Sequence, residues 1–267
     1  MMAALMRIGG VRFLNARPLI YGLQQESPAG HELHLDVPSR LSDRLERGEL
    51  DVALIPAVSY LVGVGERVVP GVSISCRGAV ATVKLFCRVP PAELRRVAAD
   101  RGSRTSVALA RLLLAERYGS HPEFVTHEPE PAAMLAAADA ALVIGQASLL
   151  GPPPPGLAAG LDLGEEWWRW QRVPLTLAFW VTRPGLTGGV ACLLQASRDR
   201  GLRRIESIVQ AAAAEFGLPA EVVRDYLSRQ LDYGFGPEHL EGYRRLGRLL
   251  AARGLVDQER ELVFTEQ

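Results

Sequence analysis

Short apolar runs and amphipathic segments follow one another along the first two thirds of the chain. The runs are roughly four to eight residues long and rich in Val, Ile and Leu, which is typical of buried strands. The segments between them repeat apolar residues three or four positions apart, which is typical of helices packed on a sheet. The predicted strands are residues 6–13, 31–37, 51–55, 72–76, 80–86, 96–100, 122–128, 140–145 and 175–182.

Helix signals fill the intervals between these strands and then continue alone to the end of the chain. Ser39 is placed to cap one helix, and Pro56 lies near the first turn of another. The helices predicted between strands are residues 15–23, 40–48, 56–61, 103–118, 130–138 and 165–171. From Val190 the pattern predicts only helices, at residues 190–214, 219–230 and 237–253.

This alternation predicts an α/β protein with a mostly parallel sheet and helices on both faces. We expect two lobes: residues 1–86 begin the first lobe, residues 87–182 form the second, and residues 183–267 complete the first with helices. The two predicted crossings are the strands VKLFCRV and LAFWVTR, which can act as paired hinges. This is the layout of the type II periplasmic-binding-protein-like fold, in which a small molecule binds in the cleft between two lobes.

The composition narrows the class of partner. The 267 residues include 48% hydrophobic side chains, enough for a buried core, and 30 basic and 30 acidic residues cancel to zero net charge. Zero net charge argues against nucleic acid or an anionic membrane as a partner. The cysteines form no paired motif, the N-terminus lacks a basic signal region, and no apolar run is long enough to span a membrane. We therefore expect a cytoplasmic protein, and the sequence leaves its oligomeric state open.

A surplus of polar groups precedes the helix predicted over 103–118. Ser103, Arg104, Thr105 and Ser106 supply three hydroxyls and a guanidinium, whereas one capping hydroxyl is enough to begin a helix. The unpaired N–H groups and partial positive charge of a helix N-terminus favour an anion. We interpret the surplus as a carboxylate-binding site; the alternative is a solvated loop followed by an ordinary cap.

Two further polar clusters are expected to face the same cleft. Asn15 and Arg17 follow the first predicted strand at its carboxyl end; the alternative is that Asn15 only caps the next helix. The other cluster alternates with apolar residues, a pattern that alone predicts a half-exposed strand. Because three clusters converge on one predicted cleft, we interpret them as binding groups. The alternating cluster comprises Ser73, Ser75, Arg77, Thr82 and Lys84.

Several motifs that would indicate other chemistry are missing. The chain has no phosphate-binding loop, no dinucleotide fingerprint, no HExxH zinc helix and no GxSxG nucleophile elbow. The five histidines lie outside the three clusters and show no ligand spacing, so we expect no metal. Trp180, on the returning strand, is the candidate to contact a ligand ring.

Six motifs stand in order over residues 6–182, about two thirds of the chain. They are RIGGVRFLNARPL, DVALIPAVSY, SISCRGAVATVKLF, SRTSVAL, ALVIGQASL and DLGEEWWRWQRVPLTLAFW. Together they resemble the chorismate dehydratase family, which performs the first step of the futalosine route to menaquinone with the type II binding-protein fold and no cofactor. The resemblance implies a lyase that removes water from chorismate to give 3-[(1-carboxyvinyl)oxy]benzoate.

The resemblance also implies roles for individual residues. Asn15 and Thr82 are expected to orient chorismate, whose own enolpyruvyl carboxylate would take the ring proton, because the motif residues include no suitable base. The residues expected to bind substrate are Arg17, Ser75, Arg77, Ser103, Arg104, Thr105, Ser106, Gly145, Gln146 and Trp180. Two positions depart from the family: Thr82 stands where serine is expected, and Gln146 where aspartate is expected. If the family's aspartate acts on the substrate, the lost charge at Gln146 affects rate or substrate preference; the alternative is a structural hydrogen bond, which glutamine can keep.

Other functions are compatible with the same fold. 1,4-Dihydroxy-6-naphthoate synthase, a later enzyme of the same pathway, has a histidine after the strand matching ALVI, where this chain has Gly145. A solute-binding protein needs export or a lipid anchor, for which the N-terminus gives no signal. The effector domain of a regulator needs a DNA-binding segment, and none precedes residue 6. We therefore expect the dehydratase.

Overall fold

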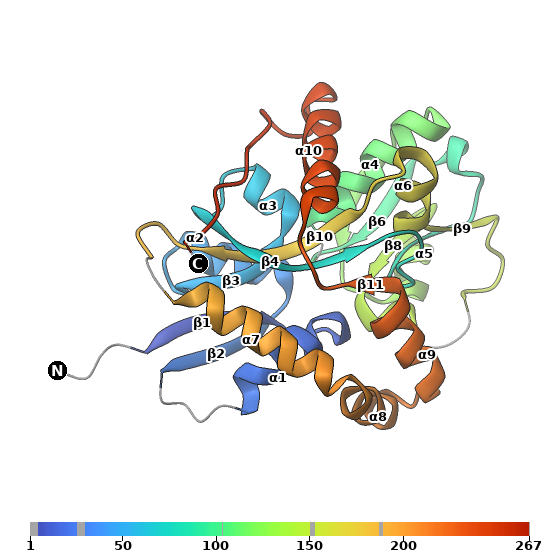
Figure 1. Cartoon of the computed structure of the whole chain (residues 1–267). Coiled ribbons are helices and arrows are strands. Elements are labelled where there is room, and N and C mark those ends of the chain that lie inside the picture. Colours follow the sequence, from blue (N-terminus) through green and yellow to red (C-terminus); the bar gives the residue numbers. More distant parts are fainter. Residues whose placement is uncertain (1–4, 26–29, 103, 150–152, 187–188, 267) are drawn as a thin grey trace.

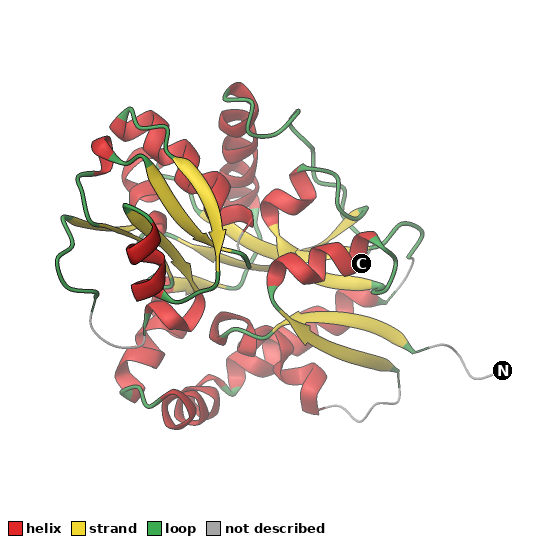
Figure 2. Cartoon of the chain, turned by 180° about the vertical axis from the view of Figure 1, so that it is seen from behind, coloured by secondary structure: helices red, strands yellow, loops and turns green. Residues whose placement is uncertain are grey.

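Two β-sheets flanked by helices form the two lobes of the molecule in a computed structural model, which describes residues 5–25, 30–102, 104–149, 153–186 and 189–266 (Figures 1 and 2). The first sheet has the order β11–β4–β10–β3–β1–β2 and the second β7–β6–β8–β5–β9. The strands of the first sheet are β1 (Met6–Val11), β2 (His31–Asp36), β3 (Val52–Pro56), β4 (Arg67–Cys76), β10 (Leu175–Thr182) and β11 (Leu231–Asp232). Those of the second are β5 (Val83–Cys87), β6 (Arg96–Asp100), β7 (Glu123–His127), β8 (Ala140–Ile144) and β9 (Ala159–Asp162).

Helices connect these strands and complete the first lobe. In the first lobe before the crossing they are α1 (Arg17–Gln25), α2 (Pro38–Glu46) and α3 (Ala57–Leu61), and in the second lobe α4 (Arg104–Tyr118), α5 (Pro131–Ala137) and α6 (Leu163–Gln171). The C-terminal segment forms α7 (Val190–Arg203), α8 (Ile205–Phe216), α9 (Ala220–Asp225) and α10 (Pro237–Ala252). Short turns of 3-10 helix, η1 (Leu14–Ala16) and η3 (Gly145–Ser148), follow β1 and β8, and a π-helical turn, η4 (Tyr226–Gln230), follows α9.

The centre of the first sheet is buried on both faces. Every residue of β3 and β10 is buried, which explains why both strands read as continuous apolar runs. β1 pairs in parallel with β2 and β3, whereas β10 runs antiparallel between β3 and β4. The sheet is therefore mixed, where the sequence pattern predicted a mostly parallel one.

The C-terminal segment returns to the first lobe by packing α7 closely on α1 (Figure 1). Two glycines allow this approach: a Cβ on Gly22 would lie 2.5 Å from the Cα of Ser197, and one on Gly201 would overlap the carbonyl of Pro18. The Ser197 hydroxyl donates to the carbonyl of Leu19 at 2.7 Å. A larger residue at either glycine would force the two helices apart.

The second sheet has β8 at its centre, between β6, which is parallel to both β7 and β8, and β5, which runs antiparallel to β8 and β9. A small cluster of buried side chains packs on one face of this sheet, separate from the main core: Phe86, Ala98, Met134, Leu135, Ala141 and Val143. β9 was not predicted, because it is only four residues long and lacks an apolar run.

The chain crosses between lobes before each of the two strands predicted as crossings. All of β5 pairs within the second sheet, and all of β10 within the first. The two crossings between the lobes therefore lie in the loops 77–82 and 172–174, and not at the predicted boundaries 86 and 182. Each loop contains a non-glycine residue in the left-handed region, Ala81 (φ 55°) and Arg172 (φ 56°), a conformation held at a cost of roughly 1–2 kcal/mol.

Three helix predictions differ from the structure. α2 begins at Pro38 with Val37 as its N-cap, so Ser39 lies inside the first turn and caps nothing. The helix predicted over 190–214 is two helices, because Arg204 leaves the helical region (φ −110°, ψ 19°) between α7 and α8. The helix predicted over 219–230 widens into the π-helical turn η4 after Asp225.

Candidate functional site

A cavity lies between the two lobes. We call it the main cavity. Its wall is mostly apolar, with a few polar groups, as is usual for a site that binds a small organic molecule. The lining residues are Val11, Phe13, Asn15, Pro38, Pro56, Ile74, Thr82, Val83, Gly102, Arg104, Thr105, Ser106, Ile144, Gly145, Leu177 and Ala178.

Asn15 reaches the main cavity from the short turn η1. The buried neighbours Leu14 and Ala16 fix this turn at the carboxyl end of β1, and the turn's N-cap is Phe13, so Asn15 caps no helix. Its Oδ1 atom is buried and has no hydrogen-bond partner in the described part of the chain. A buried, unpaired amide oxygen is costly, and a ligand donor in the cavity would satisfy it.

Thr82 stands at the end of the crossing loop and is 1% exposed. The carboxylate of Asp162 holds this loop by accepting from the backbone N–H groups of Val80 (3.0 Å) and Ala81 (2.7 Å). The Thr82 carbonyl accepts from the Gly145 N–H at 2.9 Å, which joins the loop to η3. Its hydroxyl lies 2.7 Å from the Tyr226 hydroxyl and 3.3 Å from the Val80 carbonyl. The backbone around Thr82 is therefore fixed from three sides.

The polar groups at the start of α4 are divided between two tasks. Arg104 pairs with Asp43 of α2, and the Thr105 hydroxyl donates to the Leu177 carbonyl (3.1 Å) and accepts from the Val58 N–H (3.3 Å). These contacts join α4 to the first lobe. The Ser106 hydroxyl is 4% exposed, lines the main cavity, and has no partner among the described residues. Ser103 lies outside the described residues.

Gly145 and Gln146 lie at the boundary between the main cavity and a second cavity, which we call the side cavity. Gly145 has φ +71° and lines the main cavity. Gln146 lines the side cavity, and its buried Oε1 has no partner in the described structure. The side cavity is rich in charge; its lining is Arg12, Phe13, Val37, Arg40, Asp100, Arg101, Gly102, Glu128, Pro129, Ile144 and Gln146.

Asp100 is the buried acid of the side cavity, 5% exposed. Burial raises the pKa of its carboxyl, and the hydrogen bond from the Gly102 N–H at 2.8 Å opposes part of that rise. That hydrogen bond also anchors the loop before α4. Asp100 thus shapes the helix start that faces the main cavity.

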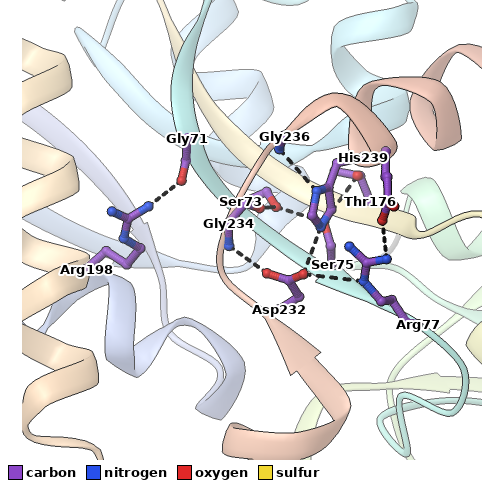
Figure 3. A network of polar contacts seen from close by, with 11 residues as sticks. Gly71, Ser73, Ser75, Arg77, Thr176, Arg198, Asp232, Gly234, Gly236 and His239 are labelled. Carbon is purple, nitrogen blue, oxygen red and sulfur yellow. Dashed lines mark hydrogen bonds and ion pairs between the residues drawn. The ribbon is translucent and has the colours of Figure 1, made fainter.

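Besides Gln146, four described residues predicted to bind the ligand do not line the main cavity. Arg17 points outward, paired with Glu215 at 2.7 Å and stacked over the Phe216 ring. Trp180 is fully buried inside the first sheet, because β10 is covered on both faces. Ser75 and Arg77 belong to a polar network between β4 and the C-terminal segment (Figure 3).

That network binds the β11 loop to β4. Ser75 is fully buried and donates to Thr176, while Ser73 donates to the Gly234 carbonyl. The ring of His239 lies 3.0 Å from Asp232, and this contact lowers the pKa of the Asp232 carboxyl to about 2 although burial opposes the shift. Arg77 pairs with Glu238 and Asp232 at the surface end (Figure 3). The polar side chains of this network bond to one another or to backbone carbonyls, and none of them lines the main cavity.

Tyr226 is the residue of the site's surroundings that the sequence did not indicate. It lies in η4, outside the six motifs, and its hydroxyl meets Thr82 from the C-terminal segment. Nothing local marks it, since an apolar spacing with one tyrosine predicts only a packed helix. Across the described residues, no group of three or more His, Cys, Asp or Glu is placed to hold a metal ion, and no helix is long and apolar enough to cross a membrane.

Solved structures share this architecture over nearly the whole chain. Protein AF1704 from Archaeoglobus fulgidus superposes with a TM-score of 0.72 at 19% identity, covering 94% of this chain and 98% of its own. The periplasmic aliphatic sulphonate binding protein SsuA from Escherichia coli gives a TM-score of 0.61 at 17% identity, covering 99% of this chain and 96% of its own. The fold is therefore the two-lobed fold of periplasmic binding proteins, as the sequence predicted.

Sequence comparison defines the family within that fold class. The profile described as menaquinone biosynthesis matches residues 6–252. A chorismate dehydratase from Thermus thermophilus is 30% identical over 259 residues, which span 90% of this chain and 91% of that protein. The chain belongs to the menaquinone biosynthesis family, and the predicted resemblance to the chorismate dehydratases is confirmed.

Proposed function

We propose that this protein is a chorismate dehydratase, a lyase that converts chorismate to 3-[(1-carboxyvinyl)oxy]benzoate and water. The kinship with the Thermus thermophilus enzyme supports the reaction, and the main cavity supports a small organic substrate. Neither 1,4-dihydroxy-6-naphthoate synthase nor a transport protein is favoured by these observations. We place the activity in the cytoplasm, because Cys76, Cys87 and Cys192 are all free thiols, as in a reducing compartment.

The polar groups on the wall of the main cavity match the two carboxylates of chorismate. Ser106 and the backbone N–H groups at the start of α4 form an anion site, since a helix N-terminus carries unpaired donors and partial positive charge. Asn15 and Thr82 lie on other walls of the same cavity. The Asn15 amide N–H and the Thr82 hydroxyl would donate to the enolpyruvyl group, and Asn15 Oδ1 would accept from the ring hydroxyl of chorismate. Arg104 contributes charge to the anion site while it stays paired with Asp43.

The observation that carries the proposed mechanism is the lack of an acid or imidazole among the described residues of the main cavity wall. The elimination removes a proton from one ring carbon and a hydroxyl from the next, and the two leave as water. The electron pair of the broken C–H bond completes the aromatic ring. With no base on the wall, the substrate's enolpyruvyl carboxylate is the proton acceptor in our proposal, and the protein supplies orientation.

Turnover of chorismate by the purified full chain tests this function. We expect the aromatic product to appear by ultraviolet absorbance, with a mass lower than that of chorismate by one water. Thr82→Val, which removes one hydroxyl from the cavity wall, is the control and should be slower by about a hundredfold. Tight binding of chorismate without any product would instead identify a binding protein and overturn the proposal.

A further inference from the structure

We propose that Tyr226 is a positioning residue of the active site, which sets the direction in which the Thr82 hydroxyl donates. This inference rests on the proposed function, because it assigns Thr82 a role toward a bound carboxylate or ether oxygen. It adds a residue from the C-terminal segment to a site otherwise built from the first two thirds of the chain.

The contact between the two hydroxyls is short and fully enclosed. Tyr226 Oη lies 2.7 Å from Thr82 Oγ1, and both side chains are 1% exposed. The Tyr226 hydroxyl has no other partner among the described residues. Burial raises its pKa well above the ordinary range, so it stays protonated and able to donate. Tyr226 does not line the main cavity, so it acts on a ligand only through Thr82.

A count of protons gives this contact a direction. Thr82 has one hydroxyl proton, and its partners inside the protein are the Tyr226 hydroxyl and the Val80 carbonyl, which is 3.3 Å away. When Tyr226 donates to Thr82, the tyrosine proton is used and the threonine proton remains for an acceptor in the cavity. A hydroxyl that accepts a hydrogen bond also becomes a stronger donor. Without Tyr226, the Thr82 hydroxyl no longer accepts this hydrogen bond and becomes a weaker donor to an acceptor in the cavity.

The backbone at both ends of the contact is held in an unusual conformation. Tyr226 begins the π-helical turn η4, a form that is rare and frequent at functional sites. Thr82 follows Ala81, which is in the left-handed region at φ 55° and is fixed by Asp162. Such conformations persist where the surroundings hold them, and here they bring the two hydroxyls together.

A double-mutant cycle with chorismate tests the proposal. Tyr226→Phe keeps the ring and removes only the donor, so we expect kcat to fall about tenfold, the loss of one hydrogen bond, with KM within about twofold. In the Thr82→Val background the same change should have no further effect on kcat, because its route to the ligand is gone. In the Thr82→Ser background, which keeps the hydroxyl, the tenfold effect should return.

Tyr243→Phe is the matched control. Tyr243 is also 1% exposed, and its hydroxyl donates to the Arg260 carbonyl at 2.9 Å, away from the main cavity. Tyr243→Phe should lower the free energy of unfolding about as much as Tyr226→Phe does, and it should leave kcat unchanged. Equal kcat for Tyr226→Phe and wild type, or additive losses in the Thr82→Val background, would overturn the inference.

Failure of the proposed function gives a different result. If the wild type produces no aromatic product, the dehydratase assignment fails, and the same cycle is then measured as affinity for chorismate by calorimetry. A weaker affinity of Tyr226→Phe that disappears in the Thr82→Val background would still support the positioning role. Equal affinities, or no binding by any of the four proteins, would overturn it.

Discussion

The ring of Phe13 lies against Gly145, so that a Cβ built on the glycine would come within 3.3 Å of the ring's Cγ. Phe13 precedes η1 of the first lobe, and Gly145 begins η3 of the second. Phe13 also lines both the main and the side cavity. This contact therefore joins the lobes at the wall between the two cavities.

Gly145→Ala should damage the site more than the fold. The new methyl group presses on the Phe13 ring. A side chain at a left-handed backbone position, here φ +71°, lowers the free energy of unfolding by roughly 1–2 kcal/mol. We expect kcat/KM for chorismate to fall by about tenfold, the effect of displacing a cavity wall. Steady-state kinetics and urea unfolding measure the two effects separately.

Gly119→Ala is the control for backbone strain alone. Gly119 has φ +61°, and nothing lies within 4 Å of the position of its Cβ. It should lose a similar free energy of unfolding and keep full activity. A Gly145→Ala enzyme as active as Gly119→Ala would show that the Phe13 contact has no bearing on the site.

Asn15→Ala should lower kcat strongly. Its Oδ1 is buried and unpaired at the cavity wall, so the main contact that it can make is with a ligand. Losing a positioning contact can cost about a hundredfold in rate. Arg17→Ala, two residues away on the outward side and paired with Glu215, is the neighbouring control and should change kcat by less than about twofold. Similar losses in both variants would point to a disturbed helix α1 instead of a lost substrate contact.

The pH dependence of kcat should show no step near pH 6.5, where an ordinary imidazole titrates. None of the five histidines lines the main cavity, and His239 is committed to Asp232 and to the Gly236 N–H. Replacing each histidine in turn should leave turnover within a few-fold. A single histidine variant that binds chorismate normally and forms no product would identify a base on the protein and contradict substrate-supplied proton transfer.

Local sequence was enough to place the residues that end a strand or begin a helix. Asn15 follows a strand, Ser106 begins a helix, and Gly145 follows another strand, so the topology of the sheets alone brings these three to one cavity. Their partners could not be predicted in the same way. Arg104 and Thr105 were interpreted as ligand donors, but the first lobe supplies Asp43 and the Leu177 carbonyl to them.

Residues on strands and in the C-terminal segment were harder to assign. Alternation does not say which face of a strand meets the cavity, and Ser75 and Trp180 turned out to be enclosed in the first lobe. The pairing register of the sheet decides which face of a strand meets the cavity, and that register depends on pairing between strands far apart in the sequence. Tyr226 meets Thr82 across a separation of 144 residues, a pairing that no local pattern carries.

Asp51 offers a test of stability against acid that is independent of the site. Its carboxylate accepts from Arg7 (Nε at 3.1 Å, backbone N at 2.8 Å) and from Arg183 Nε at 2.7 Å. The hydrogen bond from the Arg7 side chain is the chief reason that the pKa of this carboxyl is far below its usual range. Asp51 is 7% exposed, and its carboxylate links Arg7 of β1 to Arg183, which directly follows β10.

Asp51→Asn should therefore lower the free energy of unfolding at pH 7 by about 2 kcal/mol. Because the folded pKa is depressed, the wild-type advantage is complete above the unfolded pKa, near 4, and is lost as the pH falls from there toward the folded pKa. Urea unfolding at pH 7 and pH 3 should show the difference between the two proteins shrinking by about 1 kcal/mol. Glu49→Gln, which alters an exposed pair with Arg47, is the control and should be nearly neutral at both pH values. A difference that stays constant or grows toward pH 3 would mean that Asp51 does not carry this charge in the folded protein.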